Sequence, residues 1–395
     1  MTLIPACAIP NWSIDLDLNW PPRGRPTLPI SYTMYATLKA CRLRALFRAS
    51  SKVVYPRRAS PAARIGSAFH KTMEILAQQE SVASDDTKAS AERTLSLFRA
   101  LLVREIEEAR TKPRESSLAW PTERIAQVEA TVIQAAHSFW ESRRRPQNAS
   151  SARDEGINRA PVVELSIRSK DGSLCGTIDH ADRRPEGWRI IDYKTTVDPN
   201  AEHVAEHSVQ IRLYAYLWKD WTGEWPTTGT IVYLVGGNAH SVSVSPDECT
   251  AVAEEIKRYA NFSQDQPPES LANVGTACKM CEFRPWCEPF WTHRAHPEPL
   301  GDESPAPSSG IEGYVTEHRQ VGDSCLAELS TGSSSVELRY ASSRFPHLSR
   351  LTTGQRLRIL DVRIRGSASR FACIVTDRTE IYRVEDRLKL RRPDG

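Results

Sequence analysis

The chain has 395 residues, of which 40% are hydrophobic and 26% are charged, and its formal net charge is +3. This composition is typical of a soluble globular protein and leaves room for two or three domains. No stretch approaches the roughly 18 consecutive apolar residues that a membrane-spanning helix needs. The short apolar stretch near the N-terminus follows no basic residue, which argues against a secretory signal. We therefore expect a cytoplasmic protein without a membrane partner, whose nine cysteines stay reduced.

The first part of the chain is rich in proline and in positive charge. Residues 1–30 contain six prolines and are expected to form an irregular arm. From Arg23 to Lys71 there are eleven Lys or Arg residues and no Asp or Glu. A stretch of one sign can contact the phosphates of a nucleic acid, because each neutralised phosphate releases counterions. The same stretch is equally consistent with a solvated basic face that has no partner.

Helical periodicity dominates as far as residue 142. Ser31 suits the N-cap of a helix that runs through Leu46, and apolar residues then recur three or four apart in Arg64–Gln79, Glu92–Arg110 and Thr122–Ser142. Short strands separated by turn residues follow at Val162–Ile167, Leu174–Asp182 and Trp188–Tyr193. The pattern continues with a helix at Ser208–Asp220, strands at Thr230–Leu234 and His240–Val244, and a helix at Pro246–Ala260. Helices around a mixed sheet predict one α/β domain over residues 31–297.

The last quarter of the chain has a different pattern. Residues 298–310 are rich in Pro, Ser and Gly and are expected to be a linker. Residues 311–395 predict strands alone, at Gly313–Glu317, Leu326–Leu329, Val336–Tyr340, Leu357–Ile364 and Phe371–Thr376. About five strands in a segment of this length suit a small barrel such as an OB-fold. A plain β-sandwich with a scaffolding role is the alternative.

Three charged side chains of the α/β domain are predicted to meet. Asp179 ends one expected strand, and Asp192 and Lys194 lie two apart on the next, so that they share a face of the sheet. If the two strands pair, two carboxylates and an ammonium converge. Carboxylates bind Mg²⁺ or Mn²⁺, which activate water for phosphodiester cleavage. An Asp-x-Lys pair on a strand is also a common surface salt bridge, so the motif alone does not decide between these interpretations.

The surroundings of these residues resemble the RecB-like branch of the PD-(D/E)XK nucleases over about residues 31–290. Asp192-Tyr193-Lys194 is similar to the family's D-x-K core, and Gly176–Asp179 to its G-x-x-D strand. Gly66–His70 resembles its helical G-x-x-x-H motif, and Gln210–Tyr214 its Q-x-x-x-Y motif. Glu164 falls where this branch carries a glutamate on its first core strand. The five features follow one another in the family's order.

The resemblance implies a restriction-endonuclease-like α/β fold, a mixed sheet flanked by helices, and a set of site residues. It predicts a metal-binding set of His70, Asp179 and Asp192, and a catalytic set of Glu164, Asp179, Asp192, Lys194, Gln210 and Tyr214. Taken alone, a histidine on an amphipathic helix is more often packed or exposed than a metal ligand. Three other histidines are expected outside the site, His180 on the opposite face of the sheet and His203 and His207 facing solvent.

Four cysteines form a second pattern. Cys278, Cys281 and Cys287 have the spacing C-x₂-C-x₅-C, and three thiolates this close need a fourth ligand. The segment around Cys41 resembles the helix that carries the distant cysteine in iron–sulfur RecB-like nucleases. These include the CRISPR-associated RecB-like exonucleases and the nuclease domain of AddB, where proline often follows the cysteine and Arg42 stands here. The resemblance implies a [4Fe–4S] cluster, with Zn²⁺ as the alternative.

These features predict a Mg²⁺- or Mn²⁺-dependent deoxyribonuclease, an exonuclease rather than an endonuclease, that acts on single-stranded DNA or DNA ends. The resemblance suggests a role in DNA repair and recombination or in anti-phage defence. No G-x-x-x-x-G-K-[ST] motif occurs, so any motor is a separate helicase or another subunit. Two alternatives stay open: a catalytically silent DNA-binding or scaffold subunit of a nuclease–helicase or defence complex, and a zinc-stapled RNA-processing factor.

Overall fold

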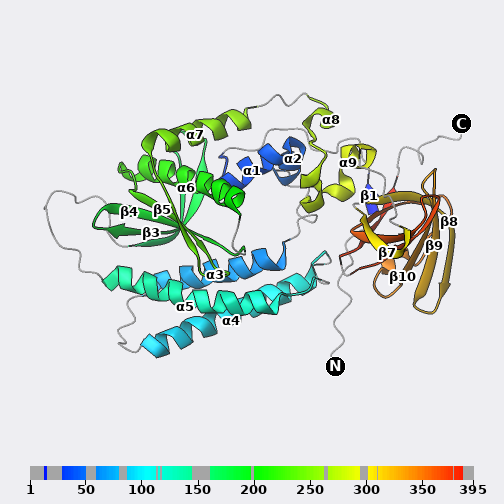
Figure 1. Cartoon of the computed structure of the whole chain (residues 1–395), viewed down its shortest axis with the longest axis horizontal. Helices are drawn as coiled ribbons and strands as arrows, with labels where there is room; N and C mark the ends of the chain where they lie inside the picture. Colours follow the sequence, from blue (N-terminus) through cyan, green and yellow to red (C-terminus); the bar gives the residue numbers. More distant parts are fainter. Residues whose placement is uncertain are drawn as a thin grey trace, which may run out of the picture.

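The computed structural model describes residues 13–15, 29–49, 59–79, 87–112, 114–115, 118–144, 161–196, 200–261, 266–293, 301–308, 310–376 and 378–385. Residues 1–12 and 16–28 of the expected arm lie outside this set, as do residues 298–300 and 309 of the expected linker. Figure 1 shows a helix-rich part around a five-stranded sheet, and beside it a β-rich part formed mainly by the end of the chain.

The helices of the first part begin and end where local chemistry favours it. Ser60 caps α3 by accepting a hydrogen bond from Ala63 N–H, and Pro61 fills the first helical position, whose N–H has no partner in a helix. Helix α6 starts after the Asn200 cap and stops at Gly223, whose φ is 84°. The helices are α1 (Tyr32–Ala40), α2 (Arg42–Ala49), α3 (Pro61–Gln78), α4 (Thr87–Thr111), α5 (Thr122–Arg144), α6 (Ala201–Thr222), α7 (Pro246–Ala260), α8 (Pro268–Leu271) and α9 (Glu288–His293), with 3₁₀ turns η2 (Thr276–Met280) and η3 (Arg284–Trp286).

The helix expected from Ser31 through Leu46 is interrupted. Ser31 caps α1 as predicted, but Cys41 has an extended backbone, with φ −167° and ψ 114°, and α2 begins after it. Leu38 before the break and Leu43 after it are both buried in one apolar cluster. Because both halves keep an apolar face, the periodicity does not reveal the break.

The sheet of the first part is mixed. Strands β2 (Val162–Arg168), β3 (Cys175–Arg184), β4 (Gly187–Lys194), β5 (Thr228–Tyr233) and β6 (Ala239–Val242) lie in that order. Neighbours are antiparallel except β4 and β5, which are parallel and are connected through α6. Helices α3, α4 and α5 cover one face, and α6 and α7 cover the other (Figure 1). The predicted mixed sheet flanked by helices is confirmed.

Strand β4 is apolar on both faces. Trp188 and Ile190 pack into the core beneath α6, whereas Ile191 and Tyr193 pack into the core formed with α3 and α5. Successive strand residues point to opposite faces, so Asp192 interrupts the α6 side of an otherwise apolar strand. Within the described part of the chain, no helix has both the length and the apolarity that crossing a bilayer requires.

The β-rich part curls on itself. Its strands are β1 (Ser13–Asp15), β7 (Gly301–Ser308), β8 (Ile311–Val321), β9 (Ser324–Ser330), β10 (Ser335–Ala341), β11 (Arg356–Leu360), β12 (Val362–Gly366), β13 (Arg370–Ile374) and β14 (Glu380–Glu385), in the order β1-β14-β11-β8-β9-β10-β13-β12-β7. Asp361 alone separates β11 from β12, and its φ of 55° bends the chain there. The bent strand therefore begins beside β8 and ends beside β13, which runs parallel to β10. This strand order is that of an OB-like barrel, as predicted.

Two predictions about irregular segments differ from the structure. Residues 13–15 of the expected arm form β1, which pairs with β14, and residues 301–308 of the expected linker form β7, which pairs with β12. Both are edge strands of the sheet. An edge strand tolerates proline because one side of it needs no ladder hydrogen bond, and β7 contains Pro305 and Pro307. Composition therefore could not distinguish these strands from irregular chain.

Arginines join the two parts through the segment Cys278–Cys287. Arg284 donates to both carboxylate oxygens of Asp361, at 3.0 and 2.8 Å. Arg358 of β11, which is fully buried, donates to Pro285 O at 2.7 Å and pairs with Glu288. We call these contacts the arginine joint.

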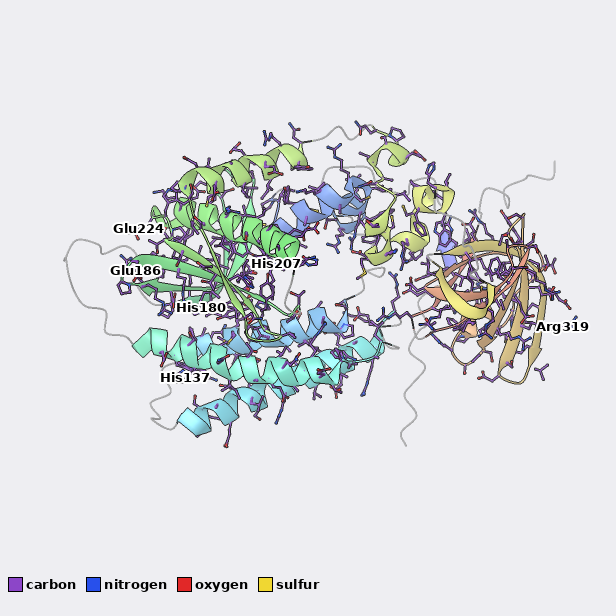
Figure 2. All side chains as sticks on the ribbon, in the orientation of Figure 1. His137, His180, Glu186, His207, Glu224 and Arg319 are labelled. Carbon is purple, nitrogen blue, oxygen red and sulfur yellow. The ribbon has the colours of Figure 1, made fainter. Side chains whose placement is uncertain are left out.

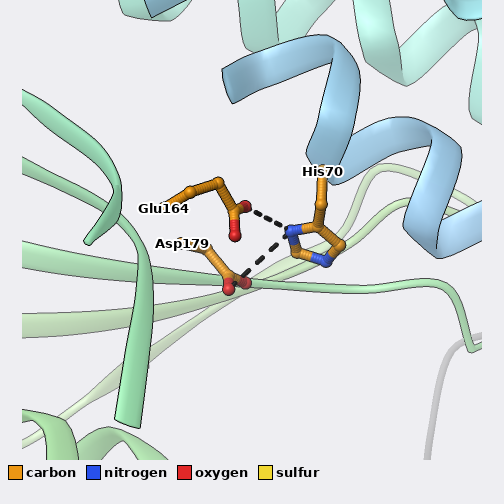
Figure 3. A group of neighbouring side chains, drawn as sticks. All are labelled: His70, Glu164 and Asp179. Atoms are coloured by element: carbon orange, nitrogen blue, oxygen red, sulfur yellow. Dashed lines mark hydrogen bonds and ion pairs between the residues drawn. The ribbon is translucent and has the colours of Figure 1, made fainter. Parts of the chain in front are cut away.

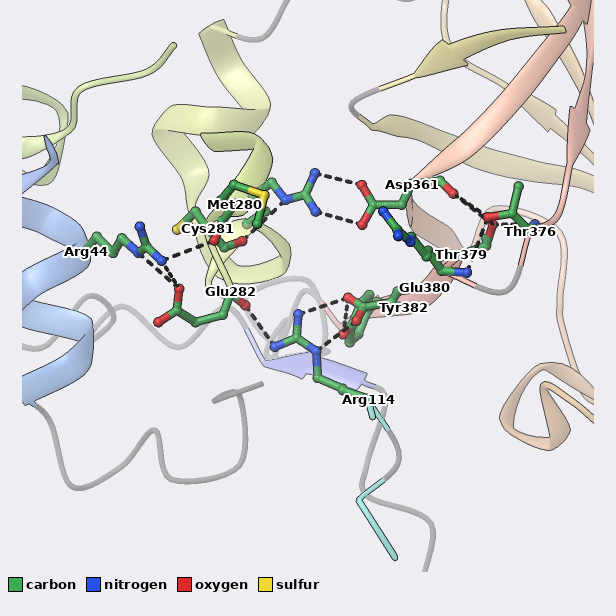
Figure 4. A network of polar contacts seen from close by, with 12 residues as sticks. Arg44, Arg114, Met280, Cys281, Glu282, Asp361, Thr376, Thr379, Glu380 and Tyr382 are labelled. Carbon is green, nitrogen blue, oxygen red and sulfur yellow. Dashed lines mark hydrogen bonds and ion pairs between the residues drawn. The ribbon is translucent and has the colours of Figure 1, made fainter. Parts of the chain in front are cut away.

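A third arginine extends the arginine joint (Figure 4). Arg114 donates to Glu282 O at 2.8 Å and to the Glu380 carboxylate of β14 at 3.0 and 2.9 Å. Glu282 in turn pairs with Arg44 and Arg48 of α2, at 2.6 and 2.7 Å. Phe290 and Trp291 of α9 pack beside these ion pairs, in one cluster with three residues of the barrel, Leu360, Tyr382 and Val384. The short cysteine segment is thus held by α2, by the turn after α4 and by the barrel.

Candidate active site

Three carboxylates form a row across the sheet. Strands β3 and β4 pair in the register that sets His180 beside Ile191, which puts Asp179 opposite Asp192. The register of β2 against β3 likewise puts Glu164 opposite Asp179. Asp192 is 1% exposed and Asp179 is 9% exposed. Like charges directly opposite one another destabilise a sheet, so this row needs positive partners.

At Glu164, strand β2 changes which face of the sheet its side chains point to. Its φ is 52°, a left-handed conformation that is rare for a residue other than glycine. Val163 packs into the core of α3 and α5, whereas Leu165, two residues later, packs into the core of α6. Strained backbone of this kind concentrates at functional sites.

His70 on α3 reaches this row (Figure 3). Its Nδ1 lies 2.7 Å from Glu164 Oε1 and 3.8 Å from Asp179 Oδ1. Among the described residues, these three are the one group of His, Cys, Asp or Glu side chains in which three or more donor atoms lie within 4.8 Å of one another. Gly66 favours the close approach of α3, because a Cβ there would lie 3.1 Å from Thr195 Cγ2, just after Lys194, and one of the two would have to shift by a few tenths of an ångström. Both ends of the predicted G-x-x-x-H motif thus have a role in the structure: Gly66 at the packing of the helix, and His70 at the carboxylates.

The closely spaced charges of the row shift the pKa values of His70 and Asp179. Burial opposes the charge of His70, but the hydrogen bond to Glu164 and the charges of Asp179, Glu164 and Asp192 outweigh it and raise the pKa of His70 to about 9. Burial and the charge of Asp192 raise the pKa of Asp179 to about 7. Tyr193 N–H donates to Asp179 Oδ2 at 2.7 Å and favours the ionised form, but does not cancel the rise.

Lys194 is held on the α6 side of the row. Its Nζ lies 2.7 Å from Asp192 Oδ2 and donates to Gln210 Oε1 at 2.7 Å. Gln210 Nε2 donates to the Tyr214 hydroxyl at 2.6 Å. Gln210 and Tyr214 are one turn apart on α6 and are both buried. A single chain of contacts therefore runs from Asp192 through Lys194 to the helix.

The seven residues predicted for the site lie together. His70, Glu164 and Asp179 are in mutual reach, and Asp192, Lys194, Gln210 and Tyr214 continue from them along one chain of contacts. Asp192 is not within 4.8 Å of all three ligand atoms of His70, Glu164 and Asp179. The close group therefore contains Glu164, whereas the predicted metal set was His70, Asp179 and Asp192. Glu164 takes that place beside His70.

Three histidines can be compared with their predicted positions, and His203 is exposed, as expected. His180 is fully buried and lies edge-on to Phe139 in the core of α3 and α5, away from the α6 side. His207 does not simply face solvent: it is half-buried, and its Nδ1 lies 2.9 Å from the Tyr233 hydroxyl. His207 stands three residues before Gln210, and this spacing is the one sequence signal that could have drawn attention to it.

The four predicted cysteines line one pocket. Cys41 between α1 and α2, Cys278 in η2, and Cys281 and Cys287 beyond it line a small pocket that is partly open to solvent. Gly275 N–H donates to Cys278 Sγ at 3.5 Å. Burial raises the pKa of Cys281 to about 11 and that of Cys287 to about 12. The other three thiols add to the rise at Cys287, which shows that all four lie within electrostatic reach.

Comparison with known proteins identifies a family for the first part of the chain. Residues 29–288 match the PD-(D/E)XK nuclease superfamily. No curated protein matches the chain. The solved structures with similarity include a replication factor A related protein from Methanobacterium thermoautotrophicum (18% identity, 24% of this chain and 96% of that one, TM-score 0.19). Others are SSO0001 (16% identity, 56% and 95%, TM-score 0.24) and a murine DNA binding protein bound to double-stranded DNA (9% identity, 57% and 95%, TM-score 0.18). The family match spans more than half of the chain, together with every residue of the site just described, and the protein belongs to the PD-(D/E)XK nuclease superfamily.

Proposed function

We propose that the protein is a metal-dependent nuclease that hydrolyses phosphodiester bonds of DNA, on single strands or at ends. The observation that carries this proposal is the carboxylate row Glu164–Asp179–Asp192, which lies between His70 and Lys194. A row of buried carboxylates costs stability unless a cation or a proton compensates it. Such a row is useful in a nuclease, where the carboxylates bind the catalytic metal, but it has no role in a scaffold.

The donor set fits Mg²⁺ or Mn²⁺. Glu164 and Asp179 offer hard oxygen ligands and His70 offers a nitrogen, all within 4.8 Å of one another. Asp192 Oδ2 is buried and has the Lys194 ammonium as its charged neighbour, at 2.7 Å, so the carboxylate keeps lone pairs for a further cation. A bound divalent metal lowers the pKa of its water and stabilises negative charge on phosphate oxygens.

The chain's own residues supply the rest of the chemistry. Lys194 stands beside Asp192 at 2.7 Å and can place an ammonium against the scissile phosphate, where it offsets the growing negative charge. It can also position the attacking water by hydrogen bonding. Gln210 and Tyr214 hold Lys194 in this orientation from α6. Burial raises the pKa of Tyr214 well above its ordinary value, so its hydroxyl stays protonated.

Within the superfamily we place the protein in the RecB-like branch, with a [4Fe–4S] cluster bound by Cys41, Cys278, Cys281 and Cys287. Their common pocket supports this assignment. Such a cluster has a structural role here, because it ties α1 and α2 to the far end of the domain.

The OB-like barrel suits a DNA partner, since OB-folds bind single strands. The basic segment from Arg23 to Lys71 can add phosphate contacts only through cations other than Arg44, Arg48 and Arg64, because these three are held in ion pairs with glutamates. We place the protein in the cytoplasm, in repair and recombination or in anti-phage defence. Unwinding, where it is needed, falls to a separate helicase.

The proposal is tested with anaerobically purified protein and DNA labelled at the 5′ or the 3′ end, with Mn²⁺ or Mg²⁺. We expect wild type to shorten single-stranded DNA from an end, and Asp192→Asn and Lys194→Ala to lose cleavage by at least 100-fold. Lys219→Ala, on the same α6 but at its C-terminal end, is the matched control and should cleave normally. Binding of DNA without cleavage by wild type under all these conditions would instead indicate a DNA-binding subunit.

The cysteine assignment has its own test. Iron, acid-labile sulfide and zinc are measured in wild type and in Cys281→Ser, with Cys249→Ser as the control for a buried cysteine outside the pocket. We expect about four iron and four sulfide per chain in wild type and in the control, and a loss of both in Cys281→Ser. One zinc and no sulfide would favour the alternative.

A further inference from the structure

His207 lies on the same face of α6 as the residues that hold Lys194. It precedes Gln210 by three residues and Tyr214 by seven, a spacing that keeps side chains on one side of a helix. Gln210 contacts Lys194 at 2.7 Å. The imidazole, which is labelled beneath α6 in Figure 2, is therefore one turn further along this face, towards the N-terminal end of the helix.

A second contact fixes the imidazole from the sheet. Tyr233 of β5 is the register partner of Lys194 on β4, and it is fully buried. Its hydroxyl lies 2.9 Å from His207 Nδ1, and the two rings are 5.8 Å apart. The side chain of His207 is thus anchored to the strand position beside Lys194.

The other ring nitrogen, Nε2, has no partner among the residues that the structure describes. Among the described residues, the contact with Tyr233 is the only hydrogen bond or ion pair of the His207 side chain, and Nε2 is not among the buried polar atoms that lack a partner. Nε2 is therefore open to solvent.

The ring is also neutral near pH 7. Burial and the nearby charge of Lys194 lower the pKa of His207 to about 4, although Asp192 acts in the opposite direction. A neutral ring carries one proton. If the Tyr233 hydroxyl donates to Nδ1, that proton sits on Nε2 and points outward.

We propose that His207 is a further substrate-binding residue of the site, whose Nε2–H donates a hydrogen bond to a phosphate oxygen of a DNA strand lying against Lys194. This inference rests on the nuclease function proposed above. An anchored neutral donor fits such a role, because it can bind phosphate without adding a second cation that would compete with Lys194 for Asp192. The competing explanation is that His207 only packs α6 against β5.

Two amide substitutions separate these explanations. In His207→Asn the side-chain amide stands near Nδ1 and can keep the contact with Tyr233, but nothing replaces Nε2. In His207→Gln the amide nitrogen reaches the position of Nε2. His203→Gln is the matched control, an exposed histidine about one turn earlier on the same helix.

The first measurement is the affinity for a fluorescent single-stranded DNA with EDTA present, so that no metal-dependent cleavage occurs. A hydrogen bond to a charged group corresponds to roughly 10- to 100-fold in affinity. We expect His207→Asn to bind that much more weakly, and His207→Gln and His203→Gln to stay within about threefold of wild type. His207→Asn binding like wild type, or His207→Gln binding as weakly as His207→Asn, would overturn the proposal.

Cleavage with Mn²⁺ then distinguishes failure of the inference from failure of the nuclease function. If wild type cleaves and His207→Asn has the same KM and kcat, the inference is wrong while the function stands. If wild type binds DNA without cleaving it and His207→Asn still binds more weakly, the function is wrong while the phosphate contact stands. Absence of DNA binding by wild type would overturn both.

Discussion

At the scale of single residues, the site contains features that are unfavourable for stability and that the rest of the sheet avoids. Three carboxylates face one another across the strands, and Glu164 adopts a left-handed backbone without being glycine. Elsewhere in the sheet, residues alternate between two apolar cores. Local departures of this kind are expected where function, rather than stability, selects the residue.

Gly176 offers a way to disturb Lys194 without touching it. A Cβ at this position would lie 2.6 Å from Tyr214 Cε1, and the Tyr214 ring is buried and has little room to move. Gly176→Ala should therefore displace Tyr214, and through Gln210 also Lys194. We expect kcat to fall roughly 10- to 100-fold, as for a displacement of about 1 Å in an active site.

Steady-state cleavage of labelled DNA measures this effect. Tyr214→Phe, which keeps the ring and removes only the hydroxyl, should lose less activity than Gly176→Ala. Gly275→Ala is the control, because nothing lies within 4 Å of its added carbon. Normal kcat in Gly176→Ala would show that the position of Tyr214 does not matter.

His347 gives the barrel a dependence on pH. Burial lowers its pKa to about 4, although the hydrogen bond from Nε2–H to Ile381 O, at 2.9 Å, opposes the change. Between the unfolded value of about 6.5 and the folded value, the unfolded chain binds a proton that the folded chain does not. This contribution to stability is therefore complete above pH 6.5 and is lost as the pH falls towards 4.

The loss can reach on the order of 3 kcal/mol, at about 1.4 kcal/mol per pKa unit. Denaturant unfolding of wild type and His347→Gln at several pH values measures it. Glutamine does not ionise, and its amide can donate to Ile381 O in place of Nε2. We expect a shallower loss of stability in the variant between pH 6.5 and 4; parallel curves would assign the dependence to other groups.

The motifs predicted which residues approach one another, but not how. Asp179, Asp192 and Lys194 follow from strand alternation, because their positions depend only on local backbone and on one pairing. Glu164 was predicted, but its partnership with His70 depends on the turn of β2 at that residue, which no pattern of residue types reveals. The contact between His207 and Tyr233 depends on the parallel register of β4 and β5, two strands that are separated in sequence by α6.

At the scale of elements, α3 is held by a buried cation. Arg64 is 4% exposed and lies 2.6 Å from Glu115, which is 2% exposed, and 2.6 Å from Glu105 of α4. The network therefore anchors α3, the helix that carries His70, to α4 and to the turn after it. A buried ion pair that loses one member leaves an uncompensated charge.

Arg64→Met is therefore expected to lower the free energy of unfolding by about 3–5 kcal/mol. Adding Glu115→Gln should restore part of that loss, because it removes the stranded charge. Arg99→Met is the control: it breaks an exposed pair between α4 and Glu129 of α5 and should change stability little. Equal stability of Arg64→Met and Arg99→Met in denaturant unfolding would contradict this account.

Elements with strong periodicity were predictable, and elements defined by their partners were not. Helices α3, α5 and α7 lie close to their predicted positions, because each has a long amphipathic pattern. Strands β1 and β7 exist only because β14 and β12 offer them an edge. The breaks at Cys41 and Asp361 are changes of direction within continuous apolar patterns, so the residue types on either side do not mark them.

At the scale of the whole molecule, the arginine joint makes the two parts mechanically dependent. Arg284 is 5% exposed and Arg358 is fully buried, and both cross the boundary between the cysteine segment and the barrel. Arg358 also lies over the ring of Trp291, 4.9 Å from its centroid. Apolar packing of α9 against β11 and β14 closes the same boundary.

We expect wild type to unfold in one calorimetric transition. Arg284→Ala leaves Asp361 without its bidentate partner, and should cost about 3 kcal/mol and separate the barrel's unfolding from that of the nuclease part. Arg339→Ala removes an exposed arginine of β10, paired with Glu337, and should leave a single transition. A single transition in both variants would show that apolar packing alone couples the two parts.

The pairing of β1 with β14 has a consequence for synthesis on the ribosome. Residues 13–15 leave the ribosome among the first, but their partners at 383–385 leave it some 370 residues later. Cys41 likewise waits for Cys278, Cys281 and Cys287 before its pocket exists. The first part can therefore be completed only after residues 278–287 have emerged, and the barrel only after β14 has emerged. Residues 13–15 must stay available for pairing until almost the whole chain has been made.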